Sequence, residues 1–115
     1  MNAEQLDKLL EDARLIVQDA VHFLRNERKV FSHEVVEYKG FNDLVSYVDK
    51  TSEEILVNGL KKLIPDAGFI TEENTLTLRD RDYVWIIDPL DGTTNFVHGI
   101  PCYCVSVGLT YKQEL

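Results

Sequence analysis

The sequence has few of the residues that support disulfide scaffolds, membrane spans or nucleic-acid binding. Its 115 residues include two cysteines, three prolines and one tryptophan. Twelve Lys and Arg face twenty Asp and Glu, so the formal net charge is −8. Binding to nucleic acids or anionic membranes relies on basic side chains. No apolar run approaches the roughly 20 residues that span a bilayer, and the amino terminus lacks a secretion signal. We therefore expect a cytoplasmic protein that binds neither nucleic acid nor membrane.

The two cysteines, Cys102 and Cys104, are separated by one residue in a β-like run. This spacing places both side chains on the same face of a strand. Structural zinc needs four ligands, and redox motifs usually have the spacing C-x-x-C. The favoured interpretation is two reduced thiols that pack as small apolar groups.

Apolar residues make up 44% of the chain and charged residues 28%, which indicates one globular domain over residues 1–115. Apolar residues recur at three- and four-residue spacing from Leu6 to Leu24 and predict an amphipathic helix that ends near residues 25–29. Asn2 and Gln5 are spaced as a capping box at its start.

A second helix is predicted from near Ser46, with Asp49 in its first turn, to Pro65. Gly59 inside it costs about 1 kcal/mol relative to Ala, which suggests close approach to the first helix. Strands are expected at residues 35–39, 68–71, 83–87 and 102–110, with a polar loop or hairpin over 75–82. A helical pair packed on an antiparallel sheet, an α+β fold, would bury both apolar stripes. The second stripe comprises Val48, Ser52, Ile55, Leu56, Leu60 and Leu63.

Acidic residues follow the predicted strands in a way that suits a metal site. Glu72 and Glu73 follow one strand, Asp88 ends the next, and Asp91 follows across a turn that contains a proline. Mg²⁺ prefers oxygen ligands, so Asp88 and Asp91 could each hold a metal, with the Leu90 carbonyl between them. Each feature alone is also typical of a solvated turn or surface pair, and Asp49 alone of a helix-terminus charge.

The residues Gly92, Thr93 and Thr94 come directly after these acids. Glycine permits a tight backbone turn, and exposed amides at the start of a short helix bind anions. A phosphate held there would face the metals, and Thr93 could orient a water molecule. This arrangement is suited to metal-assisted, in-line hydrolysis of a phosphate ester.

The run W-I-I-D-P-L-D-G-T-T-N-F at residues 85–96 resembles the signature of the inositol monophosphatase family residue for residue. The segment K-G-F-N-D-L-V-S-Y-V-D at residues 39–49 resembles the family segment that ends in a metal-site Asp, and T-E-E at 71–73 resembles its Glu-Glu element. Order and spacing agree across nearly the whole chain.

The resemblance implies roles for individual residues. Glu72, Asp88, Asp91 and the Leu90 carbonyl would bind Mg²⁺, and Asp49 would support the site through water or a further metal. Asp91 and the amides of Gly92 and Thr93 would bind the substrate phosphate. Glu72 and Thr93 would activate the attacking water, so Glu72, Thr93 and Asp49 are the implied catalytic residues. Glu73 would lie behind the ligands, Lys39 is open between the site and a solvated turn, and His98 is interpreted as a surface histidine.

The resemblance also implies a layered αβαβα sandwich of which residues 1–115 form the amino-terminal domain, without the carboxy-terminal half. The expected enzyme is a lithium-sensitive, dimeric phosphoric monoester hydrolase whose partner is a small phosphate ester, foremost inositol 1-phosphate. Relatives act on 3′-phosphoadenosine 5′-phosphate, fructose 1,6-bisphosphate, histidinol phosphate or NADP. The other reading is a non-catalytic fragment of the same fold, and the 115-residue chain by itself is expected to be inactive.

Overall fold

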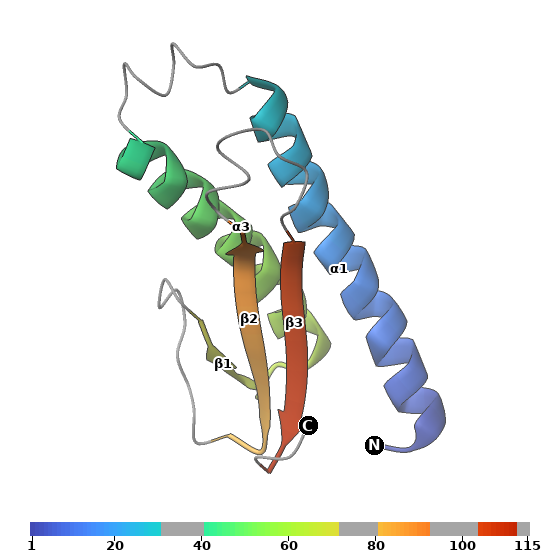
Figure 1. Cartoon of the computed structure of the whole chain (residues 1–115). Helices are drawn as coiled ribbons and strands as arrows, with labels where there is room; N and C mark the ends of the chain where they lie inside the picture. The colour runs from blue at the N-terminus through green and yellow to red at the C-terminus, as the bar shows by residue number, and fades with distance from the viewer. Residues whose placement is uncertain (31–40, 72–80, 93–103, 113–115) are drawn as a thin grey trace.

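The computed structural model describes residues 1–30, 41–71, 81–92 and 104–112, with the side chains of residues 29–30 and 41–45 excepted. In these ranges the chain forms helices α1 (Ala3–Val30) and α3 (Phe41–Leu63) and strands β1 (Gly68–Ile70), β2 (Tyr83–Asp91) and β3 (Cys104–Tyr111). The helices lie side by side against one face of the sheet (Figure 1). The predicted α+β class, a helical pair on a sheet, is confirmed. The strand predicted at residues 35–39 lies outside the described part of the chain.

Helix α1 begins with the predicted capping box. The Gln5 N–H donates to Asn2 Oδ1 at 2.8 Å, and the Asn2 N–H donates to Gln5 Oε1 at 3.0 Å. These two bonds satisfy amide groups that have no partner within a helix. The apolar stripe of α1 faces α3 and the sheet, with Ala20 and Leu24 fully buried.

Helix α3 begins earlier than expected, at Phe41 instead of near Ser46. The apolar spacing of Phe41, Leu44 and Val48 already fits a helix, and this pattern prevails over the turn signal of the intervening polar residues. Asp49 is therefore an interior residue of the helix and not part of its first turn.

The sheet has the order β1-β2-β3, and its pairing corrects the expected antiparallel sheet. Strand β1 runs parallel to β2, with Ile70 paired to Ile86, whereas β2 and β3 are antiparallel. A parallel pair needs a crossover of about a dozen residues, and the segment 71–82 is long enough to supply it. The sheet is therefore mixed.

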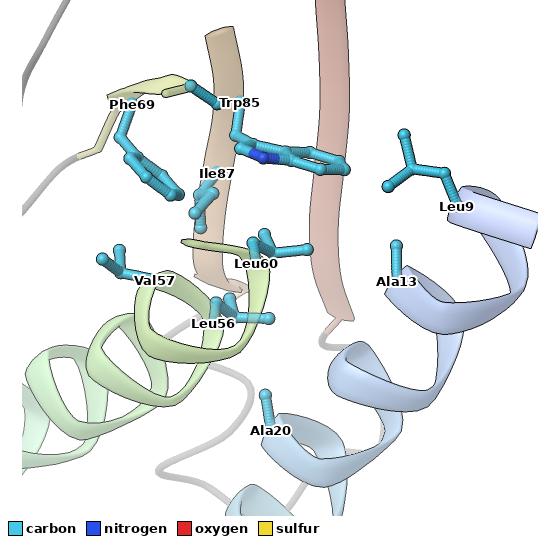
Figure 2. Packing of buried hydrophobic residues seen from close by; sticks show 10 residues of the cluster. Leu9, Ala13, Ala20, Leu56, Val57, Leu60, Phe69, Trp85 and Ile87 are labelled. Carbon is cyan, nitrogen blue, oxygen red and sulfur yellow. The ribbon is translucent and has the colours of Figure 1, made fainter. Parts of the chain in front are cut away.

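The core lies between the two helices and the sheet (Figure 2). Ile87 of β2 and Phe69 of β1 point toward α3, and the ring of Trp85 extends across the sheet toward Leu9 of α1. Trp85 is 2% exposed and is therefore a core residue of β2. Side chains of α1 close the other side of the core, among them Leu9, Ala13 and Ala20.

Gly59 lies at a point of close approach between α3 and α1. A Cβ atom at this position would lie 2.7 Å from Cγ2 of Ile16, closer than side-chain atoms tolerate. The prediction that Gly59 permits close approach of the two helices is confirmed.

Candidate active site

The acidic end of β2 is a bulged strand, not the tight turn predicted after Asp88. Asp88 pairs with Ser106 and Asp91 pairs with Cys104, so three steps along β2 match two along β3. The extra residue lies in the segment that contains Pro89, which has no N–H to donate to a ladder. The strand therefore continues to Asp91, with a local irregularity between the two acids.

Two hydrogen bonds hold the peptide unit at the centre of this bulge. The buried hydroxyl of Ser52 on α3 donates to the Pro89 carbonyl at 2.8 Å. The Leu90 N–H of the same peptide unit donates to Oδ1 of Asp88 at 3.3 Å. Helix α3 is thus connected to the Asp88 carboxylate through one backbone unit.

Asp91 ends β2 on the exposed side of the sheet, beside Cys104 of β3. The Cys104 thiol lies 4.0 Å from Oδ2 of Asp91, within range of a weak hydrogen bond to sulfur. Cys104 is a free, exposed thiol, which corrects the expectation that it packs as an apolar group. Because Val105 and Val107 face the core, the alternation of the strand places Cys104 on the opposite face. Cys102 lies outside the described residues.

Gly92 follows Asp91 with a φ of 84°. Only glycine adopts this conformation without steric cost, which agrees with the expectation that the backbone requires glycine at this position.

An open hollow of about 530 Å³ lies on the sheet beside Asp88. Ile70 and Ile86 form its apolar wall, and Thr71, Asp88 and Ser106 provide polar groups. Strand β1 ends here, with Ile70 paired to Ile86, whereas β2 continues to Asp91. The Thr71 hydroxyl is buried and has no hydrogen-bond partner among the described residues.

Helix α3, which packs on the opposite face of the sheet from the hollow, carries polar residues on the side that contacts the end of β2. Asp49 is half-buried, and Ser52 and Glu53, one turn further on, are fully buried. Residues three and four apart share one side of a helix, so these three side chains lie on a common face. Asp49 is therefore placed on the side of α3 that contacts the acidic end of β2 through Ser52.

Several residues singled out in the sequence lie outside the described part of the chain. They include Glu72 and Thr93, two of the three expected catalytic residues, together with Glu73, Lys39 and His98. The site that the structure describes is therefore Asp88, Leu90, Asp91 and Gly92, with Asp49 on the neighbouring helix. In the whole described part of the chain, no three or more acidic, His or Cys side chains lie close enough together to form a metal cluster.

The donors present are those that suit Mg²⁺. Asp88 and Asp91 offer hard carboxylate oxygens at a partly open edge of the sheet, and Leu90 adds a carbonyl between them in sequence. Mg²⁺ is typically held by one or two carboxylates plus waters and substrate phosphate oxygens. The Thr71 hydroxyl, which has no partner among the described residues, lines the same hollow and fits a site that takes a further polar ligand or water.

Comparison with known proteins identifies the family to which this fold and sequence belong. The model of the inositol monophosphatase family matches residues 5–115. The chain is 40% identical over 111 residues to the fructose-1,6-bisphosphatase/inositol-1-monophosphatase of Aquifex aeolicus, a match that covers 96% of this chain and 42% of that protein. It is 53% identical over 79 residues to inositol monophosphatase of Mesembryanthemum crystallinum, covering 65% of this chain and 29% of that protein.

Solved structures agree. The fold matches extragenic suppressor protein suhB from Bartonella henselae with a TM-score of 0.74 and 32% identity, over 91% of this chain and 40% of that one. It matches inositol monophosphatase from Anabaena with a TM-score of 0.74 and 30% identity, over 93% and 36% of the two chains. The fold and sequence thus define an α+β protein with the architecture of these relatives. The chain belongs to the inositol monophosphatase family, and it spans less than half the length of these relatives.

Two buried polar residues were missed in the sequence. Ser52 was counted as part of an apolar stripe, and Glu53 was not singled out, yet both are fully buried on the side of α3 described above. The available signal was their position: polar side chains one turn after Asp49, in the face of a helix that otherwise carries apolar residues.

Proposed function

We propose that this protein takes part in Mg²⁺-dependent hydrolysis of a phosphate monoester, with inositol 1-phosphate as the foremost substrate. The observation that carries the proposal is the pair Asp88 and Asp91 on the bulged end of β2, next to an open hollow and followed by the positive-φ Gly92. Membership of a phosphatase family supports the reaction class. The name of the Aquifex aeolicus relative supports the substrate class.

In this proposal Asp88, Asp91 and the Leu90 carbonyl hold Mg²⁺ together with Glu72, and Asp49 supports them from α3. Mg²⁺, when bound, supplies positive charge that stabilises the phosphate and lowers the pKa of a water molecule. The amides of Gly92 and Thr93, with Asp91 beside them, bind the substrate phosphate. The Thr93 hydroxyl orients the attacking water, and the Glu72 carboxylate accepts its proton.

Other substrates and a non-catalytic role are the alternatives. The name of the Aquifex aeolicus relative also includes fructose-1,6-bisphosphatase, so fructose 1,6-bisphosphate is an alternative substrate. The compounds 3′-phosphoadenosine 5′-phosphate and histidinol phosphate are further alternatives. A relative from Pasteurella multocida, 48% identical over 75 residues, is named Nus factor SuhB. The net charge of −8 argues against direct nucleic-acid binding by this chain.

The remaining family-based proposals concern inhibition, location and assembly. We propose inhibition by millimolar lithium, a cytoplasmic location and a homodimer. In the described part of the chain, neither helix has an apolar stretch long enough to cross a membrane.

The test is steady-state phosphate release by the complete gene product, with inositol 1-phosphate, fructose 1,6-bisphosphate and histidinol phosphate compared at equal concentration. We expect release that requires Mg²⁺, stops on chelation with EDTA and is highest with inositol 1-phosphate. Turnover that persists at full rate in EDTA would refute the metal-dependent mechanism. Absence of turnover on every ester, with Mg²⁺ present, would favour the non-catalytic alternative.

A further inference from the structure

The peptide unit between Pro89 and Leu90 is hydrogen-bonded at both ends. A peptide unit is planar and rigid, and in its trans form the carbonyl and the N–H point to opposite sides. Ser52 Oγ donates to the carbonyl end at 2.8 Å, and the N–H end donates to Oδ1 of Asp88 at 3.3 Å. Any change that rotates this plane therefore moves the Leu90 N–H, whose hydrogen bond Asp88 accepts.

We infer that Ser52 is a positioning residue that orients the Asp88 carboxylate through the Pro89–Leu90 peptide unit. This inference rests on the proposed function, in which Asp88 is a metal ligand. With one oxygen of Asp88 occupied by the Leu90 N–H, the carboxylate has a fixed orientation toward the hollow. Hydrogen bonds in a chain also polarise one another, so the Ser52 bond strengthens the donor that Asp88 receives.

The location of Ser52 favours this role over simple packing. Ser52 is fully buried, and alanine would fill nearly the same space there without a polar group. Burial of a hydroxyl is unfavourable unless it is hydrogen-bonded. Its bond reaches across from α3 to the one segment of β2 whose register with β3 is irregular. The hydroxyl thus fixes the backbone where the regular ladder does not.

A purely structural role, in which the bond only attaches α3 to β2, is the competing explanation. The chain offers a matched control for it. Thr110 Oγ1 donates to the Val84 carbonyl at 3.2 Å, which is also a side-chain hydroxyl bonded to a β2 carbonyl, but at the opposite end of the strand. Thr110→Val removes that bond while keeping the shape of the side chain.

The first measurement uses the metal-free chain. We expect Ser52→Ala to shift the NMR resonances of the Leu90 amide and the Asp88 side-chain carboxyl carbon, whereas Thr110→Val leaves both in place. Ser52→Thr keeps the hydroxyl and should leave both resonances close to wild type. Unchanged Leu90 and Asp88 resonances in a folded Ser52→Ala protein would overturn the inference, whether or not the protein binds metal.

The second measurement is a titration with Mn²⁺, followed by electron paramagnetic resonance of the free ion, with thermal unfolding recorded on the same samples. Partners of metal ligands typically contribute about 10- to 100-fold to metal affinity. We expect the Kd for Mn²⁺ to rise about tenfold in Ser52→Ala and to stay near wild type in Thr110→Val and Ser52→Thr. Equal weakening by Ser52→Ala and Thr110→Val, in step with lost stability, would refute positioning. If the wild-type protein binds no Mn²⁺, the proposed function fails and the NMR comparison alone decides the role of Ser52.

Discussion

At the scale of single residues, Asp88 and Asp91 have the same side chain but different surroundings. Asp88 is half-buried and accepts the Leu90 N–H, so part of its hydrogen-bonding capacity is already used within the protein. Asp91 is exposed, and among the described residues its carboxylate has a weak hydrogen-bond donor in the Cys104 thiol. Judged by the hydrogen bonds of the described residues, the Asp91 carboxylate has more capacity left to bind a cation than the Asp88 carboxylate.

This difference gives the residue-scale prediction for Asp91→Asn in the complete gene product. The amide keeps the shape but removes the charge that holds a divalent cation. We expect phosphate release to fall by more than about 100-fold, because loss of even a partner of a ligand costs about 10- to 100-fold. The measurement is kcat/KM for inositol 1-phosphate as a function of Mg²⁺ concentration.

Asp82→Asn provides the control for that substitution. Asp82 is an exposed acid just before β2, at the other end of the strand from Asp91. The same change of charge there should leave kcat/KM near wild type. Near-normal turnover by Asp91→Asn at ordinary Mg²⁺ would remove Asp91 from the site.

Single residues could be predicted from the sequence where the local structure admits only one type of side chain. Gly59 and Gly92 were identified because helix contact and positive φ both favour glycine. The exposure of Cys104 was not predicted, since the sequence alone does not say which face of a strand meets the core. Ser52 was missed because its partner is a carbonyl 37 residues away.

At the scale of elements, the close contact between α1 and α3 depends on Gly59, because glycine has no side chain. A Cβ there would meet Ile16, which is β-branched and therefore stiff near the backbone. Overpacking typically costs about 1–3 kcal/mol, while alanine gains about 1 kcal/mol in helix propensity over glycine. We expect Gly59→Ala to lower the free energy of unfolding by about 1 kcal/mol, as measured by urea denaturation.

A double-mutant cycle isolates the contact. In an Ile16→Ala background the space is open, so Gly59→Ala should stabilise the protein through helix propensity. If Gly59→Ala stabilises both backgrounds equally, the two helices do not meet at this point.

Elements with a strong periodicity were predicted well, and their ends and pairings less well. The stripe of α1 and its capping box both follow from local sequence. The proline in β2 was interpreted as a turn because proline cannot join a ladder, but a bulge accommodates the same residue inside a strand. The parallel pairing of β1 and β2 depends on the path of the chain between them, which local patterns do not encode.

At the scale of the whole molecule, the match to the Aquifex aeolicus relative covers 96% of this chain and 42% of that protein. The described residues bring two carboxylates and one carbonyl to the candidate site, whereas a two-metal mechanism requires both reacting oxygens to be held. Positioning of a substrate accounts for about 7–11 kcal/mol of barrier lowering in well-oriented reactions. We therefore expect the 115-residue chain by itself to release little or no phosphate.

The assay compares the 115-residue chain with the full-length Aquifex aeolicus relative at equal concentration on inositol 1-phosphate. Each tenfold in rate corresponds to about 1.4 kcal/mol, so loss of half of the positioning lowers turnover by several orders of magnitude. A rate within tenfold of the relative would show that these 115 residues suffice for the chemistry.

The most direct measurement on the candidate site is anomalous diffraction from crystals of the complete gene product soaked in Mn²⁺. The ion replaces Mg²⁺ at sites with oxygen ligands and is located without reference to activity. We expect a manganese peak within about 2.5 Å of carboxylate oxygens of Asp88 and Asp91, close to the Leu90 carbonyl. Well-occupied manganese elsewhere, with none at the end of β2, would contradict the proposed metal centre.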